Sequence, residues 1–167
     1  MDTIEIRKAH IEDARFIALL GRVTFTETFG HLFRNKNELF DYYNKIFSVK
    51  KIKKSLSKYN TYYWIAFVNE LPVGYSKLKL NSPSEFIDCK NASQLQKIYV
   101  LKDFLPMKIG LELQNILIDK AKNKQRTFIW LSVLYSNKEL YIFILRMVLL
   151  KLVITIYKLV SKILNLL

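Results

Sequence analysis

Residues 95–134 limit the fold of this chain more than any other stretch. Residues 95–100 have the pattern of a strand, residues 108–124 carry apolar side chains at helical spacing, and residues 127–134 form a second apolar, β-branched run. Strands that are joined through a helix pair in parallel, by a crossover of one preferred hand. The stretch therefore predicts a βαβ unit inside a mixed α/β sheet.

The residues before this unit predict more strands and three helices. Ile4 and Ile6 alternate with charged residues, as in a half-buried strand. Apolar residues at helical spacing predict a helix over residues 11–29 and two more within residues 36–58; the apolar face of the first helix is expected to hold Ile17, Leu20, Val23 and Phe25. Residues 62–68 and 72–80 predict a hairpin that turns at Asn69 and Glu70, followed by a polar loop over residues 81–91. The order β-α-α-α-β-β-β-α-β predicts a mixed α/β sandwich.

Composition excludes several classes of protein. Of the 167 residues, 51% are hydrophobic, which is too many for a disordered chain and fits one globular domain. Cys89 is the single cysteine, so neither a disulfide framework nor a multi-cysteine metal site is expected. His10 and His31 are far apart and indicate no metal. Asp2 and Glu5 interrupt the N-terminus before any signal-like apolar run, so we expect a cytoplasmic protein.

The net charge of +13 suits an anionic partner without naming one. The charge is spread along the chain, and residues 139–167 contribute a net +3. The densest run, at residues 50–54, is read as the solvated face of a helix, and no basic cluster with interleaved aromatics follows it. We therefore expect no nucleic acid, although a positive field suits a phosphorylated ligand.

A short loop between residue 100 and the helix at residue 108 favours an anion site. The first N–H groups of a helix are unpaired, and its positive dipole end attracts phosphate. Gly110 would let the backbone approach such a ligand closely. An ordinary strand-to-helix turn has the same pattern, so this feature alone leaves both readings open.

Four motifs together resemble the GNAT acetyltransferases. Residues 96–100 (Gln-Lys-Ile-Tyr-Val) with residues 108–110 (Lys-Ile-Gly) resemble the family's motif A, and residues 70–75 resemble its hairpin. Residues 128–133 resemble the next core strand, followed by Asn137 where the family carries an Asn. Residues 24–29 (Thr-Phe-Thr-Glu-Thr-Phe) further resemble the bacterial PaiA-like polyamine acetyltransferases. The resemblance covers residues 3–138.

This resemblance implies the GNAT acyl-CoA N-acyltransferase sandwich, with a central mixed sheet and helices on both faces. It implies acetyl-CoA as cosubstrate, no metal, and a small primary amine such as a polyamine as acceptor. Acetyl-CoA would lie between the two central strands, and Glu27 and Phe29 would lie on the acceptor side. The implied acetyl-CoA contacts are Ile98, Tyr99 and Val100 on the pantetheine arm, backbone groups of Leu105, Met107, Lys108, Ile109, Gly110 and Leu111 on the pyrophosphate, and Asn137.

The chain also departs from the family pattern. The family loop reads Gln/Arg-x-x-Gly-x-Gly/Ala, whereas Leu105, Lys108 and Gly110 occupy these positions here, so that only the last is kept. Gln96 stands where many members place a carboxylate base, and an amide cannot accept that proton. No catalytic residue is assigned.

Residues 139–167 differ from the family altogether, so we divide the chain into a GNAT domain, residues 1–138, and an atypical apolar, basic tail. The family continues with a helix that carries the tyrosine acid, an Asn-Gly-Phe turn and a last strand, whereas this chain has no Gly or Pro after Gly110. Written in A/T-rich codons, the tail can be shifted by one base, before Glu139, into Arg-Ala-Ile-Tyr-Phe-Tyr-Ile-Lys-Asn-Gly-Phe. We hypothesise that the tail is a frameshift product that lacks the tyrosine.

Another account treats the tail as a functional amphipathic helix. Its polar residues recur at helical spacing, and the rest is Leu, Ile and Val. A basic helix of this kind suits an anionic membrane surface better than a span across it. The alternative function is a catalytically silent CoA-binding or membrane-surface protein, and a homodimer is left open. The polar positions are Lys151, Thr155, Lys158, Lys162 and Asn165.

Overall fold

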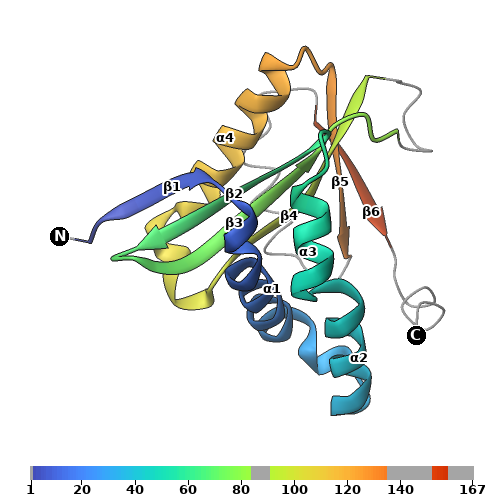
Figure 1. Ribbon diagram of the computed structural model, residues 1–167. Coiled ribbons are helices and arrows are strands. Elements are labelled where there is room, and N and C mark those ends of the chain that lie inside the picture. The colour runs from blue at the N-terminus through green and yellow to red at the C-terminus, as the bar shows by residue number, and fades with distance from the viewer. Residues whose placement is uncertain (1, 84–90, 135–151, 158–167) are drawn as a thin grey trace.

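The protein is built around one six-stranded sheet in which the strands follow chain order from β1 to β6 (Figure 1). The computed structural model describes residues 2–83, 91–134 and 152–157. The strands are β1 (Ile4–Lys8), β2 (Thr61–Val68), β3 (Leu71–Lys79), β4 (Ala92–Val100), β5 (Phe128–Leu134) and β6 (Leu152–Tyr157).

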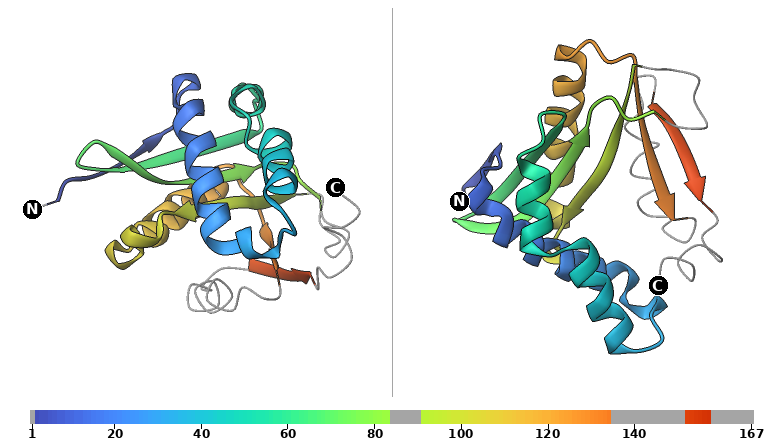
Figure 2. Two further views of the ribbon diagram at one scale, coloured as in Figure 1. Left: turned by 90° about the horizontal axis from the view of Figure 1, so that it is seen from below. Right: turned by 45° about the vertical axis from the view of Figure 1, so that its right-hand side comes forward.

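Helices cover both faces of this sheet, as predicted (Figure 2). Three helices lie on one face, and α4, which connects β4 to β5, lies on the other. Short 3-10 segments precede α1, follow it and precede α4. The helices are η1 (Ile11–Asp13), α1 (Ala14–Phe29), η2 (Gly30–Leu32), α2 (Lys36–Ile46), α3 (Val49–Leu56), η3 (Lys102–Met107) and α4 (Ile109–Asn123).

The strand pairing confirms the predicted βαβ unit. Strands β1 to β4 pair antiparallel in sequence, and β4 pairs parallel with β5 across the α4 crossover. The predicted hairpin is β2–β3, and Asn69 and Glu70 both have positive φ at its turn. Asn and a short two-residue loop suit this left-handed backbone.

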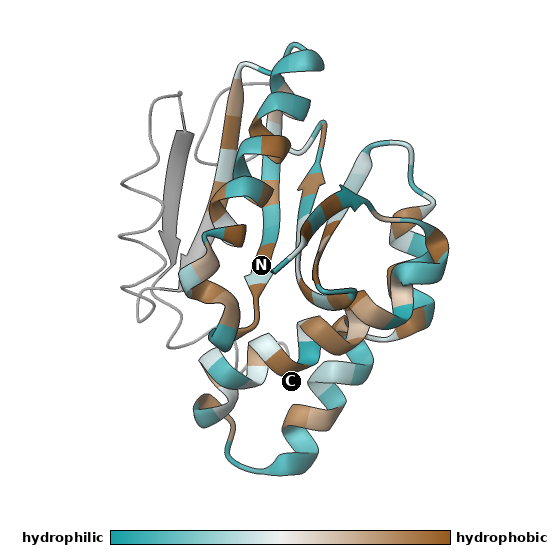
Figure 3. Ribbon diagram, turned by 90° about the vertical axis from the view of Figure 1, so that its left-hand side faces the viewer, coloured by the Kyte–Doolittle hydropathy of each residue, from teal (hydrophilic) through white to brown (hydrophobic). Residues whose placement is uncertain are grey.

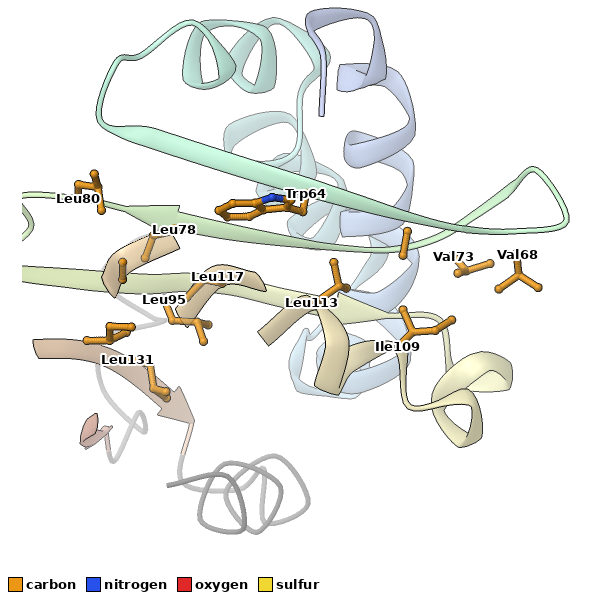
Figure 4. Close-up of a cluster of buried hydrophobic side chains, with 13 residues drawn as sticks. Trp64, Val68, Val73, Leu78, Leu80, Leu95, Ile109, Leu113, Leu117 and Leu131 are labelled. Atoms are coloured by element: carbon orange, nitrogen blue, oxygen red, sulfur yellow. The ribbon is translucent and has the colours of Figure 1, made fainter. Parts of the chain in front are cut away.

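Strict alternation along β2 divides the core into two layers. Trp64, Ala66 and Val68 pack with α4, whereas Ile65 and Phe67 pack with α1 and α3. Figure 4 shows the α4 layer, in which Leu113 and Leu117 lie against strand residues. The helices show hydrophobic and hydrophilic residues in turn along their length, as one-sided burial requires (Figure 3).

Local capping residues begin the helices on the first face. The Asn35 side chain accepts from the Glu38 N–H at the start of α2, and the Ser48 hydroxyl accepts from the Lys51 N–H at the start of α3. Asp13, which is buried before α1, forms a two-pronged ion pair with Arg7 of β1 at 2.7 and 2.9 Å. This pair lowers the pKa of Asp13 and ties the first strand to the first helix.

Two predictions need correction. Val23, predicted on the apolar face of its helix, is 37% exposed, because Ile17, Leu20 and Phe25 already fill the inward side of α1. The tail, predicted to be helical, forms strand β6 at Leu152–Tyr157, parallel to β5. Thr155 therefore does not lie on a helical polar face; β-branched residues and an open sheet edge favour the strand. The remaining tail positions of that face lie outside the described residues.

Candidate functional site

Strands β4 and β5 separate after a short paired stretch, and this separation defines the candidate site. They pair only from Ala92 with Phe128 to Gln94 with Trp130. Beyond that point the two strands diverge (Figure 1). Residues 95–100 of β4 remain hydrogen-bonded to β3 on one side only, so the backbone groups on the other side can bind an extended ligand.

A β-bulge at Gln96 shapes this free edge. Leu78 of β3 pairs with Leu95 and the preceding Lys77 pairs with Lys97, so that Gln96 is the extra residue on β4. The bulge reverses the side-chain alternation. Leu95 packs with α4, whereas Lys97 turns to the opposite face, above the Phe47 ring.

The edge leads through η3 to the start of α4. Lys108 caps this helix with a left-handed backbone (φ 59°), and its carbonyl accepts from the N–H groups of Leu111 and Glu112. Within the described chain, no backbone carbonyl accepts from Ile109 or Gly110. The two free N–H groups lie at the positive end of a helix of 15 residues, which is the geometry that binds phosphate.

Replacing Lys108 by glycine is expected to stabilise the protein by about 1 kcal/mol. The left-handed conformation costs an L-residue about 1–2 kcal/mol, and glycine adopts it freely at a modest entropic cost in the unfolded chain. Urea unfolding of wild type and Lys108→Gly measures the difference. Lys108→Ala, which keeps the strain and loses the charge, is the control; equal stability of the Gly and Ala variants would contradict the assignment of strain.

The structure brings most of the predicted acetyl-CoA contacts onto one continuous path. Ile98, Tyr99 and Val100 are half-buried on the free edge of β4. Leu105, 56% exposed, and Met107 follow in η3, and the remaining three begin α4 after the Lys108 cap. The Ile109 side chain is fully buried in the core beneath α4, so it does not line the path. Asn137 lies outside the described residues.

The two predicted acceptor residues lie at the end of α1 beside this path. The Glu27 carboxylate is exposed and accepts from the Lys102 N–H at 3.4 Å, where β4 leads into η3. Phe29 belongs to a cluster of aromatic rings between α1 and α2, which Tyr99 joins from β4. The buried members of this cluster are Phe25, Tyr43 and Phe47.

Two lysines that the sequence prediction missed lie on the same face. Lys77 and Lys97 are directly opposite each other on β3 and β4, and both are half-buried. Burial lowers the pKa of Lys77 to about 7, helped by the Lys97 charge, and lowers the pKa of Lys97 to about 8. In the sequence, one signal could have found Lys77: the spacing Tyr75-x-Lys77 puts both side chains on the same face of a predicted apolar strand.

Two other kinds of site are absent from the described residues. There, no three His, Cys, Asp or Glu side chains come together as metal ligands would. No helix in the same part of the chain has the length and apolar character needed to cross a membrane. The lysines at residues 50–54 are exposed on α3 while Ile52 is buried, so this charge run is a solvated helix face, as predicted.

Known proteins share this architecture. PaiA N-acetyltransferase of Thermoplasma acidophilum, solved with coenzyme A, superposes with a TM-score of 0.75 at 21% identity, covering 86% of this chain and 87% of that one. A GCN5-related N-acetyltransferase of Ralstonia eutropha superposes with a TM-score of 0.69 at 18% identity, covering 96% and 97%. At these identities the likeness shows a common fold.

Sequence comparison identifies the family. An uncharacterised N-acetyltransferase from the pepI 3′ region of Lactobacillus delbrueckii subsp. lactis is 22% identical over 140 residues, which cover 83% of this chain and 80% of that protein. The model of the acetyltransferase (GNAT) family matches residues 25–146, most of the chain, including both strands of the diverging pair. The protein is a member of the GNAT acetyltransferase family.

Proposed function

We propose that this protein transfers an acetyl group from acetyl-CoA to a small primary amine. The observation that carries the proposal is the continuous path from the free edge of β4 to the start of α4. The pantetheine arm of coenzyme A contains two amides, which match the unpaired backbone groups of residues 95–100. Its pyrophosphate matches the free N–H groups of Ile109 and Gly110.

The chemistry of this transfer is mainly positional. The amine lone pair attacks the thioester carbonyl, a C–N bond forms, the C–S bond breaks, and the thiolate takes a proton while the amine loses one. Holding both reactants in attack geometry supplies much of the rate enhancement. Gln96, exposed at the bulge, cannot act as the base, so the amine would lose its proton to solvent or to another group.

Polyamines are the first acceptor class to test. They are supported by the resemblance of residues 24–29 to the PaiA-like branch and by the exposed Glu27 carboxylate beside the path. The aromatic cluster that includes Phe29 offers an apolar wall for the carbon chain of an amine. By the same proposal the protein acts in the cytoplasm, where acetyl-CoA is available.

Acetyl-CoA protection and coenzyme A release test the proposal together. A ligand that binds only the native state raises the free energy of unfolding by mass action, by about 2.7 kcal/mol at 100 times its Kd, and thereby raises the unfolding midpoint. We expect acetyl-CoA to raise the midpoint, and we expect thiol release with at least one amine of a panel that includes spermidine. Failure of acetyl-CoA to protect would contradict the binding path itself.

A catalytically silent CoA-binding protein is the second candidate. It is favoured by Gln96, which lacks a carboxylate at the bulge, and by the departure of the tail from the family pattern. Protection by acetyl-CoA without thiol release from any amine would select it. The membrane-surface version of this candidate relied on a helical tail, whereas Leu152–Tyr157 form strand β6. Liposome co-sedimentation that disappears on truncation at Ser136 would support membrane binding despite this strand.

We also propose that the tail from Glu139 onward is a frameshift product. The proposal rests on the absence of Gly and Pro after Gly110 and on the family motif that one base shift restores. Resequencing the coding DNA across codons 134–145, with the intact mass of the natural protein, decides it. A restored frame predicts an active enzyme, whereas the present frame predicts weak activity or none.

A further inference from the structure

Two lysines face each other across the sheet with no acidic partner among the described residues. Lys77 of β3 and Lys97 of β4 are register partners, and their side chains lie on the face covered by α1, α2 and α3. The Lys77 Nζ lies 5.1 Å from the Tyr63 ring centroid, and the Lys97 Nζ lies 4.7 Å from that of Phe47. In the described chain, neither forms an ion pair.

This arrangement is costly in the absence of a ligand. Like charges directly opposite across two strands repel, and a half-buried ammonium group without a counter-ion loses solvation that nothing replaces. Lys51 on α3 adds a third positive charge near both. The rings of Tyr63 and Phe47 offset only part of the cost through cation–π attraction. An anion bound between the two lysines would satisfy both.

A buried hydroxyl beside the pair points to the same kind of ligand. Tyr75 and Tyr99 form the next register pair along β3 and β4, on the same face. Tyr75 is fully buried, and its hydroxyl has no hydrogen-bond partner among the residues that the structure describes. Burial raises its pKa well above 10, so the hydroxyl stays protonated and can donate. It points toward α1, where a Cβ on Gly21 would lie 3.0 Å from it, and it lies close to the Phe47 ring that the Lys97 Nζ also contacts.

The bulge residue joins this cationic site to the edge where the thioester would lie. Lys97 follows Gln96 directly, at the start of the free stretch of β4. A group bound at Lys97 would therefore lie beside the acetyl group of the donor. An acceptor that delivers its amine to the thioester would bring the rest of its structure onto the lysine pair.

We propose that Lys77 and Lys97 form a binding site for a carboxylate, and that the acceptor is a small amine that also carries this anionic group. The inference rests on the proposed function and restricts the acceptor class from small primary amines to those that also carry a carboxylate. An ammonium–carboxylate hydrogen bond contributes about 1.5–3 kcal/mol, which is roughly a tenfold or greater change in specificity. A polycation such as spermidine would add positive charge to the pair and is expected to be the poorer acceptor.

A binding experiment tests the site without any turnover. Glutarate, a dicarboxylate without an amine, replaces chloride in the buffer at constant ionic strength. The unfolding midpoint is measured in both buffers for wild type, Lys97→Met and Lys77→Met. We expect glutarate to raise the wild-type midpoint by several degrees and to leave both variants unchanged. Lys120→Met is the matched control, since the Lys120 Nζ also lies 4.7 Å from a ring centroid, that of Tyr62 on the other face.

Either of two results would overturn the proposal: no glutarate effect on wild type, or an equal effect on Lys97→Met. Loss of acetyl-CoA protection in Lys97→Met with glutarate protection kept would also overturn it, because the lysine would then hold a phosphate of the donor. Both variants remove an uncompensated charge, so we expect them to fold; far-UV circular dichroism checks this. Failure to fold in one leaves the other variant to decide.

A kinetic experiment then tests the acceptor. The kcat/KM for 4-aminobutyrate is compared with those for its amide, for butylamine and for spermidine. We expect wild type to prefer the acid over the amide by about tenfold or more, and Lys97→Met to show a ratio near one. An equal ratio in both proteins contradicts the site. Absence of turnover with every amine would defeat the proposed function, whereas the glutarate experiment still decides the anion site.

The pH dependence gives an independent check with a definite sign. Because the pKa values of both lysines lie below the ordinary 10.5, the unfolded chain binds more protons between about pH 7 and 10.5, and stability rises with pH across that window. Glutarate protection should be large at pH 6.5, where both lysines are charged, and absent at pH 10.5. Protection that persists at pH 10.5 would contradict the lysine site. The other titratable groups around the pair are three lysines and four tyrosines: Lys51, Lys58, Lys79, Tyr42, Tyr63, Tyr75 and Tyr99. Burial raises the pKa of each of the four tyrosines, which favours their neutral form across this pH window.

Discussion

Replacing Gly74 by alanine is expected to destabilise the protein by about 1–3 kcal/mol and to weaken acetyl-CoA protection at the same time. A Cβ at this position would lie 2.8 Å from the Tyr99 carbonyl oxygen and 3.3 Å from the Val100 Cα. These are backbone atoms of β4, which no rotamer change can move. The methyl group would therefore push away the strand that carries the candidate pantetheine edge.

Urea unfolding with and without acetyl-CoA measures both effects. Gly30→Ala is the matched control, because the nearest neighbour of the added Cβ would be the Thr26 methyl group at 3.1 Å, a side-chain atom of an exposed residue and not backbone of a neighbouring strand. We expect that variant to stay within about 0.5 kcal/mol of wild type. A Gly74→Ala protein with unchanged stability and protection would show that β3 and β4 are not as close as the structure places them.

Truncating Leu113 to alanine should cost about 2–5 kcal/mol of unfolding free energy. Leu113 is fully buried in the layer between α4 and the sheet, where Ile109 and Leu117 flank it one turn away on either side (Figure 4). The loss combines the transfer free energy of the removed carbons with the cavity they leave. Since α4 also presents the free N–H groups, we expect the variant to bind acetyl-CoA less tightly.

Chemical denaturation at 25 °C checks the prediction for Leu113. Leu19→Ala is the control, since Leu19 is also a helical leucine but is 59% exposed, and its truncation should change stability by less than about 0.5 kcal/mol. Similar losses in the two variants would mean that α4 does not cover the sheet as described. A loss of unfolding free energy in Leu113→Ala without any loss of acetyl-CoA affinity would show that ligand binding does not depend on how α4 packs.

Most of the fold could be predicted from local patterns. The aromatic and β-branched run of β2, the helical spacing in α4 and the Asn69-Glu70 turn each determine one element from neighbouring residues, so their bounds agree within about three residues with the structure. Val23 was placed wrongly because a helix buries only one side, and periodicity cannot say how wide that side is. Strand β6 was missed because a polar-apolar pattern in a Leu- and Ile-rich run suits a helix equally well.

The candidate site, like the fold, could be predicted only in part from the sequence. By itself the sequence determined the order of the elements from β1 to β5 and the crossover at α4, and a family resemblance supplied the residues proposed to bind acetyl-CoA. Only the tertiary structure decided that β4 and β5 diverge after Gln94 and that Gln96 is a bulge. Without that bulge, Lys97 would share a face with Leu95. One extra residue in the strand turned Lys97 to the face covered by α1, α2 and α3, opposite Lys77. Side-chain direction in a sheet depends on the hydrogen-bond register with the neighbouring strand, which no local pattern records.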